Sequence, residues 1–204
     1  MPDSQTPTPQ RSGRGSQTAR DMVLSLAALL LIVAAVLGFS RGCSFSPGGP
    51  TIDTSAVPTV DVHSALTGIA AGTDVPVREP KVPTGWRANS TDTISIGTGD
   101  QARPAVRVGW LTSSGHYLRL SQTQGAARDL IASETDDPKS EPAATGTVDV
   151  EGVSWTIYPA RRNETSWLAN VGGVRLLVSG NGKDADFRTL AQAVQTATPL
   201  PKQS

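Results

Sequence analysis

An uncharged apolar run, Met22 to Phe39, constrains this chain more than any other feature of its sequence. As a helix, its 18 residues extend roughly 27 Å at 1.5 Å per residue, which is close to the ~30 Å hydrocarbon core of a bilayer. Residues 1–20 contain three arginines and a single acid, Asp3, and by the positive-inside rule this end stays in the cytoplasm. The sequence therefore predicts a single-pass protein of the cell membrane whose C-terminal part is extracytoplasmic.

Two other fates of the run compete with a retained signal-anchor. A cleaved signal peptide has an apolar core of about 7 to 15 residues before a small-x-small site; this run is longer, although residues 38–40 match such a site. A lipoprotein would be acylated on Cys43, the only cysteine, but Ser40 and Arg41 stand where apolar residues are expected. We therefore favour the retained anchor.

Composition divides the chain into four parts. Residues 1–20, rich in Pro, Ser, Thr and Gln, predict a disordered cytoplasmic arm. Residues 21–40 form the predicted transmembrane helix, and residues 41–58, with their prolines and glycines, predict a flexible linker. Residues 59–200 carry regular hydrophobic patterns and are expected to form one exported domain, which packing holds together because no internal disulfide is available.

Hydrophobic periodicity predicts that the exported domain is α+β. Helical stripes at i, i+3, i+4, i+7 occur over residues 62–69 and 187–194, with a shorter apolar face over 126–131. Alternating apolar residues predict a hairpin over 106–120 and a four-strand meander over 147–180. Because single helices separate the hairpins, we expect an antiparallel sheet with helices on one face.

Local signals refine this picture. Gly72 is expected to end the first helix of the domain, and Asp184 to cap the last one. Three prolines in residues 76–83 favour an extended passage across the domain surface, ending on Trp86. Trp110 and Trp155 have apolar strand neighbours, so both are expected in the core.

Catalytic and metal-binding patterns are weak. His63 and His116 are the only histidines, and neither has a second ligand at i+2 to i+4 spacing. Two serines precede His116, but they lie where a hairpin turn is needed, and no GxSxG elbow occurs. The acids of residues 134–137 lack the glycine and distal glutamate of a calcium loop, and we interpret them as a solvated loop. We expect no catalytic residue, no metal, no cofactor and therefore no enzyme.

Three residues are candidates for contact with a partner. Eighteen basic and eighteen acidic residues cancel, so no basic patch indicates nucleic acid. Trp167 has polar neighbours in TSWLAN, and exposed tryptophans often anchor protein interfaces. Arg161 and Arg162 lie between two predicted strands, where they could face anionic headgroups or a cell-wall polymer, although ordinary surface arginines explain the pair more simply.

Several stretches resemble a known family. They are RDMVLSL, CSFSPGGP, VPVREPKVPTGW, VDVEGVSW and FRTLAQAV, and together they span most of the chain from Arg20 onward. The layout resembles the uncharacterised actinobacterial membrane proteins of domain of unknown function 4245. The resemblance implies a retained N-terminal anchor and an exported α+β domain, with no known activity and no catalytic positions to carry over.

Two functions fit these observations. The leading hypothesis is an envelope-facing accessory module that binds another envelope protein and performs no chemistry. The alternative is a lipid or glycolipid carrier in which the concave face of the sheet forms an apolar pocket. A sheet face sealed by its own helices would argue against the carrier.

Overall fold

A computed structural model describes residues 15–39, 59–135 and 142–202. The chain divides into two compact units, Met1–Ile52 and Asp53–Ser204, and each is treated by itself. Most of the predicted arm, the predicted linker with Cys43, and the acids Asp136 and Asp137 lie outside the described residues.

The first unit contains helix α1, Gly15–Phe39, which begins before the apolar run and ends with it. Its large apolar side chains are exposed, among them Met22 and Leu31. Within the described part of the chain, no helix is long and apolar enough to cross a membrane. The anchor over residues 21–40 stays a prediction.

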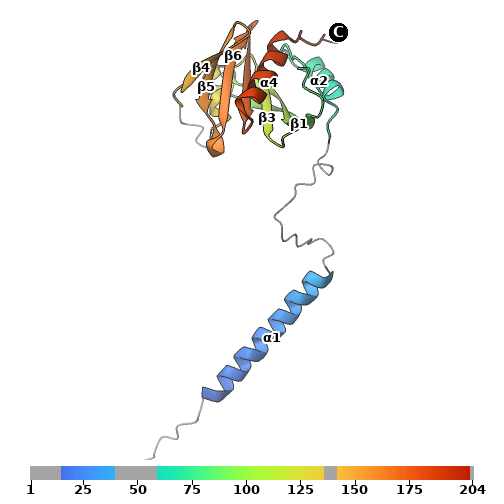
Figure 1. The fold of residues 1–204 in the computed structure, drawn as a ribbon, viewed down its shortest axis with the longest axis vertical. Coiled ribbons are helices and arrows are strands. Elements are labelled where there is room, and N and C mark those ends of the chain that lie inside the picture. Colours follow the sequence, from blue (N-terminus) through green and yellow to red (C-terminus); the bar gives the residue numbers. More distant parts are fainter. Residues whose placement is uncertain (1–14, 40–58, 136–141, 203–204) are drawn as a thin grey trace, which may run out of the picture. The chain divides into compact units, whose positions relative to one another are not determined.

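The second unit is built on one seven-stranded sheet in which all neighbouring strands are antiparallel (Figure 1). The strands are β1 (Arg87–Ile96), β2 (Arg103–Leu111), β3 (Tyr117–Thr123), β4 (Gly146–Val150), β5 (Val153–Pro159), β6 (Thr165–Val171) and β7 (Val174–Gly180). Their order is β1-β2-β3-β7-β6-β5-β4, so two meanders join where β3 pairs with β7. The predicted α+β class and antiparallel sheet are confirmed.

Three helices accompany the sheet: α2 (Val62–Ala71), α3 (Ala127–Ala132) and α4 (Asp184–Thr196). In the described part of the chain, the short 3-10 turns η2 (Gly99–Gln101) and η3 (Arg161–Asn163) join strands. Gly72 ends α2 as predicted. The predicted cap of α4 is wrong, because Lys183 is the N-cap and the Asp186 carboxylate accepts a hydrogen bond from its backbone N–H at 3.1 Å.

The larger hydrophobic core lies on the sheet face that α2 and α4 cover, here called the α4 face. Both helices bury their predicted stripes there, for example Leu66 of α2 and Leu190 of α4, each 0% exposed. From the strands, the alternating residues point into the same core. They include Val106, Val108, Trp110, Leu118, Leu120, Trp155, Leu176 and Val178. Trp110 and Trp155 both lie in this core, as predicted.

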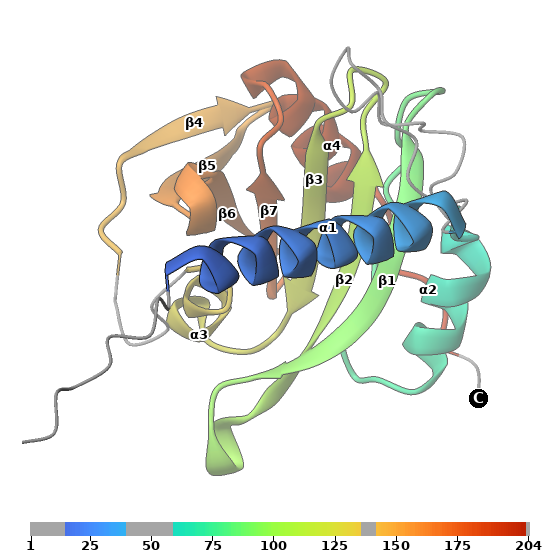
Figure 2. The same ribbon diagram turned by 90° about the horizontal axis from the view of Figure 1, so that it is seen from below.

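Helix α3 lies on the opposite side of the sheet, here called the α3 face. Leu130 of α3 packs with Ile96, Ala105 and Leu177, whose strand neighbours point to the α4 face. In Figure 2, α4 lies behind the strands and α3 in front of them. The prediction that all helices share one face is therefore wrong, because α3 belongs to the crossover from β3 to β4 and packs on the far side.

An extended passage, as predicted, runs from α2 to β1 and frames the surface between α2 and α4. The buried side chain of Gln122 holds it, accepting from Arg78 N–H and donating to Arg78 C=O, both at 2.8 Å. The chain after α4 pairs with the same passage, because Arg78 forms a bridge with Pro199 and Leu200 N–H donates to Val77 C=O at 2.8 Å. Trp86, at the end of the passage, is partly buried against the core.

Candidate binding groove

Trp167 lies in the core rather than at a surface. Its side chain is 2% exposed and packs against Phe187 of α4, with ring centroids 5.1 Å apart. The expected exposed patch around Trp167 is therefore wrong. The polar neighbours that suggested it point elsewhere, since successive residues of a strand alternate between the two faces.

Arg161 and Arg162 differ in their surroundings. The Arg161 guanidinium donates to Ser133 C=O, and its backbone N–H donates to Glu134 C=O at 2.9 Å. Arg162 is exposed and takes a left-handed conformation with φ of 56°. Arg161 therefore connects the β5–β6 loop to the end of α3. The sequence did not predict this role, because it suggested two ordinary surface arginines.

Glu134 is the second residue whose surroundings the sequence did not reveal. We interpreted it as part of a solvated loop, but it is 1% exposed and pairs with the Arg119 guanidinium. The interpretation as a solvated loop is wrong for Glu134, because β3 supplies a partly buried basic partner, Arg119.

The α4 face of the sheet is filled by the protein itself. Val106, Val108, Leu118 and Leu120 are all 0% exposed beneath α2, α4 and the extended passage. Among the described residues, this face therefore has no room for the apolar pocket that the carrier hypothesis places on it.

His116 takes part in a turn network. Its Nδ1 lies 2.8 Å from Ser114 Oγ and 3.9 Å from Asp186 Oδ2, and Thr112 Oγ1 lies 3.0 Å from Ser114 Oγ. A serine–histidine–acid relay needs the serine and the acid on different ring nitrogens. Because both approach Nδ1, this arrangement stabilises the β2–β3 hairpin and does not activate Ser114.

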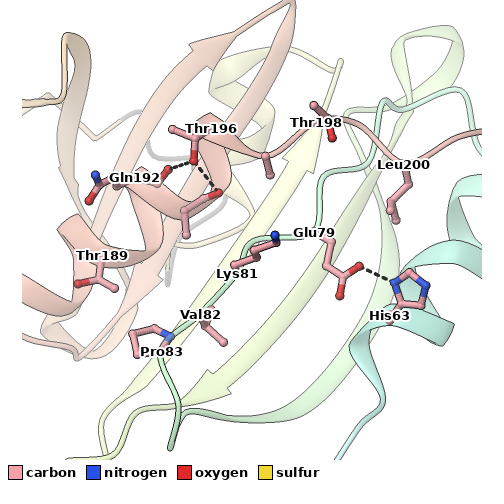
Figure 3. A pocket seen from close by; sticks show the side chains of 12 residues that line it. His63, Glu79, Lys81, Val82, Pro83, Thr189, Gln192, Thr196, Thr198 and Leu200 are labelled. Atoms are coloured by element: carbon pink, nitrogen blue, oxygen red, sulfur yellow. Dashed lines mark hydrogen bonds and ion pairs between the residues drawn. The ribbon is translucent and has the colours of Figure 1, made fainter.

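A groove of about 910 Å³ opens between α2, the extended passage and α4 (Figure 3). Its residues come from three parts of the domain that are far apart in the sequence. They are His63 of α2; Glu79, Lys81, Val82 and Pro83 of the passage; and Thr189, Gln192, Ala193, Thr196, Ala197, Thr198 and Leu200 of α4 and the chain after it. No candidate from the sequence lies in this groove except His63.

His63 and Glu79 form an ion pair on the α2 side of the groove. His63 Nδ1 lies 2.8 Å from Glu79 Oε2, and the histidine side chain is 71% exposed. The hydrogen bond and the charge of Glu79 raise the pKa of His63 above its usual value. At the N-cap of α2, Asp61 accepts from Ser64 N–H and Oγ, which lowers the pKa of Asp61 and fixes the first turn that presents His63.

The α4 side of the groove presents methyl groups and one amide. Thr189 Oγ1 donates to Ala185 C=O and Thr196 Oγ1 to Gln192 C=O, each at 2.8 Å. These hydroxyl protons are therefore used within the helix. Thr189, Ala193 and Thr196 all line this side of the groove, and Figure 3 shows the two threonines on α4.

The described residues do not assemble a metal site. Among residues 15–39, 59–135 and 142–202, no three His, Cys, Asp or Glu side chains group closely enough to hold a metal ion. The His63–Glu79 pair supplies two ligands at most. What the groove offers is shape, methyl groups and a few hydrogen-bonding side chains.

One sequence signal would have pointed to the groove. Residues 189–200 contain no charged side chain, although a solvated helix face is normally rich in charge. The helical stripe at 187, 190, 191 and 194 drew attention to the buried side of α4, whereas 189, 192, 193 and 196 repeat with the same spacing on the groove side.

Comparison with known proteins gives a family and no activity. Residues 14–194 match the family described as "Protein of unknown function (DUF4245)". No curated protein and no solved structure shows significant similarity to the chain.

Proposed function

The chain belongs to the DUF4245 family, and since that description gives no activity, we propose a function from the residues and their geometry. The domain of residues 59–200 is a non-catalytic binding module that accepts a segment of a partner protein in the groove between α2 and α4. Residues 21–40 hold this module at the cell membrane, with the domain on the extracytoplasmic side.

The observation that carries the proposal is the uncharged groove side of α4. Thr189, Gln192, Ala193 and Thr196 repeat at i, i+3, i+4, i+7 beside a groove of about 910 Å³. Small side chains allow another backbone to approach closely, and the single amide of Gln192 can hydrogen-bond it. Grooves beside helices are a recurrent way of binding a peptide segment.

The other side of the groove suits a polypeptide as well. Val82 and Pro83 offer apolar surface, whereas Lys81 and the His63–Glu79 pair place charges at the margin. An apolar centre with a polar margin is typical of protein–protein interfaces. A compact small molecule would more often meet aromatic walls and convergent polar groups, and among the described residues no Phe, Tyr or Trp lines this groove.

Support for the membrane anchor comes from the N-terminal sequence. The run Met22 to Phe39 is uncharged and preceded by arginines, as expected for an anchor with its N-terminus in the cytoplasm. Large apolar side chains such as Leu24 and Leu31 are 68% and 72% exposed on α1. Contiguous exposed apolar surface of this kind normally contacts lipid or protein.

A photo-crosslinking residue placed at Gln192 of the full-length chain, in its own cells, tests the binding proposal. The control position is Ser154, an exposed residue of β5 that does not line the groove. We expect a discrete adduct with one protein from position 192 and none from position 154. Equal adduct patterns at both positions would contradict a groove-specific partner.

The mass of the full-length protein, extracted from its own membranes, tests the anchor separately. We expect an unacylated mass that includes residues 2–40. A mass that begins at Cys43 and carries acyl chains would replace the anchor by a lipid attachment, and an unacylated mass lacking the run would mean that it is cleaved.

A further inference from the structure

The two edge strands of the sheet, β1 and β4, differ in how they are protected (Figure 2). β4 is only five residues long, and its Asp149 C=O accepts from the Arg188 guanidinium of α4 at 3.0 Å. β1 is ten residues long and contains neither lysine nor proline. Short strands, lysines, prolines, bulges and covering groups are the usual means by which proteins keep sheet edges from pairing.

Only the first half of β1 has such protection. Val60 N–H, from the chain before α2, donates to Ala88 C=O at 3.0 Å, and a bulge follows between Ala88 and Ser90. Beyond the bulge the strand lies open, since Thr93 and Ser95 are exposed. The second half of β1 is therefore the unprotected edge of the sheet.

The orientation of the backbone groups along this half follows from Pro104 of β2. Pro104 lies opposite Ser95, it has no N–H, and its C=O accepts from Thr123 Oγ1 of β3 at 2.7 Å. The N–H and C=O of Ser95 therefore point away from β2. Because this orientation alternates along an antiparallel strand, the backbone groups of Thr93 and Thr91 point outward as well. Among the described residues, no other segment binds these outward backbone groups.

The open half of β1 is complementary to a second copy of itself. When two copies pair antiparallel about Thr93, each Thr93 faces its counterpart, and Thr91 faces Ser95 on both sides of the centre. A hydrogen-bonded pair exchanges two bonds, so these pairs together form about six backbone hydrogen bonds. Threonine and serine are also favourable cross-strand neighbours. Every outward backbone group of the open half then has a partner.

Charge favours the same register. Asp92 would face Ile94 of the other copy, while its carboxylate stays with the Arg107 guanidinium of its own β2. A register centred on Asp92 would place two carboxylates opposite each other, which is unfavourable. A register centred on Ile94 would place Thr91 opposite Gly97, which lies beyond the end of β1.

We propose that two copies of this chain associate through β1, in an antiparallel register centred on Thr93, so that their seven-stranded sheets form one continuous sheet. Addition of a strand to an exposed sheet edge is a recurrent mode of protein association. A twofold axis makes such an interface self-complementary. The surface is separate from the groove, because no residue of β1 lines the groove.

Disulfide cross-linking of the full-length chain in its own cells, with copper phenanthroline as the oxidant, tests the register. Cys43→Ser removes the native cysteine, and Thr93→Cys places one cysteine at the centre of the proposed pair. There the two Cα atoms lie about 5.5 Å apart, a separation that suits a disulfide. Thr147→Cys, at an exposed position of β4, is the control. We expect about tenfold more disulfide-linked dimer from Thr93→Cys than from Thr147→Cys.

Equal dimer yields at the two positions would overturn the proposal. A disulfide between Thr93→Cys and a different protein would overturn it too, because the edge would then belong to another partner.

The mass of the assembly provides a second, independent readout. Thr93→Pro removes an outward N–H that β2 does not use, and proline is tolerated at such edge positions. We expect native mass spectrometry in mild detergent to show a dimer for the parent chain and a monomer for Thr93→Pro, with the circular dichroism of the domain unchanged. A monomeric parent chain, or a Thr93→Pro variant that stays dimeric, would contradict association through β1.

Discussion

Trp167 of β6 and Phe187 of α4 pack against each other with ring centroids 5.1 Å apart and planes inclined by 33°. The Arg188 guanidinium lies 5.8 Å from the centroid of the Trp167 ring. The pair joins the second meander to the helix that forms one wall of the groove. Trp167 therefore influences the groove through the position of α4 rather than by touching a ligand.

Replacing Trp167 by alanine is expected to destabilise the domain. Removing a buried indole leaves a cavity and typically costs about 3–5 kcal/mol of unfolding free energy. Urea unfolding followed by circular dichroism measures this loss, with Trp86→Ala as the control because Trp86 is only partly buried. A loss for Trp167→Ala no larger than that for Trp86→Ala would contradict the core position.

The His63–Glu79 pair predicts a pH-dependent contribution to stability. The pKa of His63 is raised in the folded state by Glu79, so the stabilisation is fully present below the unfolded pKa of about 6.5. It is lost as the pH rises through the higher folded pKa. We expect the Tm difference between the parent chain and Glu79→Gln to be largest below pH ~6.5 and to vanish at alkaline pH.

An NMR titration provides the direct check on this pair. The His63 ring signal should titrate at higher pH in the parent chain than in Glu79→Gln. An unchanged His63 titration would mean that the pair does not form in solution.

Replacing only one residue of the Arg119–Glu134 pair should lower the free energy of unfolding more than replacing both. Glu134→Leu leaves the Arg119 guanidinium, 19% exposed, without its partner, and such losses run to about 3–5 kcal/mol. The double variant Arg119→Met, Glu134→Leu removes both charges and should recover a large part of that loss. A double-mutant cycle from urea unfolding measures the coupling, and additive single effects would contradict a direct pair.

Gly109 of β2 is predicted to be required for the position of Tyr117. A Cβ added at Gly109 would collide with the ring and hydroxyl of Tyr117 and with Ser90 Oγ. Gly109→Ala should therefore cost about 1–3 kcal/mol. In a Tyr117→Ala background the same substitution should cost much less, and an equal cost in both backgrounds would show that the ring does not lie over Gly109.

Regular periodicity in the sequence predicted most of the sheet and the helices α2, α3 and α4. Val106, Val108 and Trp110 alternate along β2 as expected, and the stripe from Phe187 to Val194 is the buried side of α4. The side of the sheet that α3 occupies was not predictable. An apolar stripe on a helix indicates that the helix packs against the sheet, but it does not indicate which of the two sheet faces the helix covers. Only the packing of Leu130 on Leu177 decides it.

The error at Trp167 has a similar origin. Its polar neighbour Ser166 lies on the other face of β6, so the polarity of Ser166 says nothing about the tryptophan. The informative neighbours are Ala169 and Val171, two and four residues along, which face the same core. The groove was missed because His63, Glu79 and Gln192 are far apart in the sequence and form no local motif.

The most direct test of the proposed function compares two arginine substitutions on α4 in the chain that carries the crosslinking residue at position 192. Ala193→Arg fills the groove, whereas Ala185→Arg places the same charge on an exposed position of the same helix outside it. Circular dichroism confirms that both variants fold before adducts are compared. We predict that Ala185→Arg keeps the adduct of the parent chain and that Ala193→Arg reduces it at least about tenfold, a loss of about 1.4 kcal/mol in binding. Equal adduct yields in the two variants would contradict a partner bound in the groove.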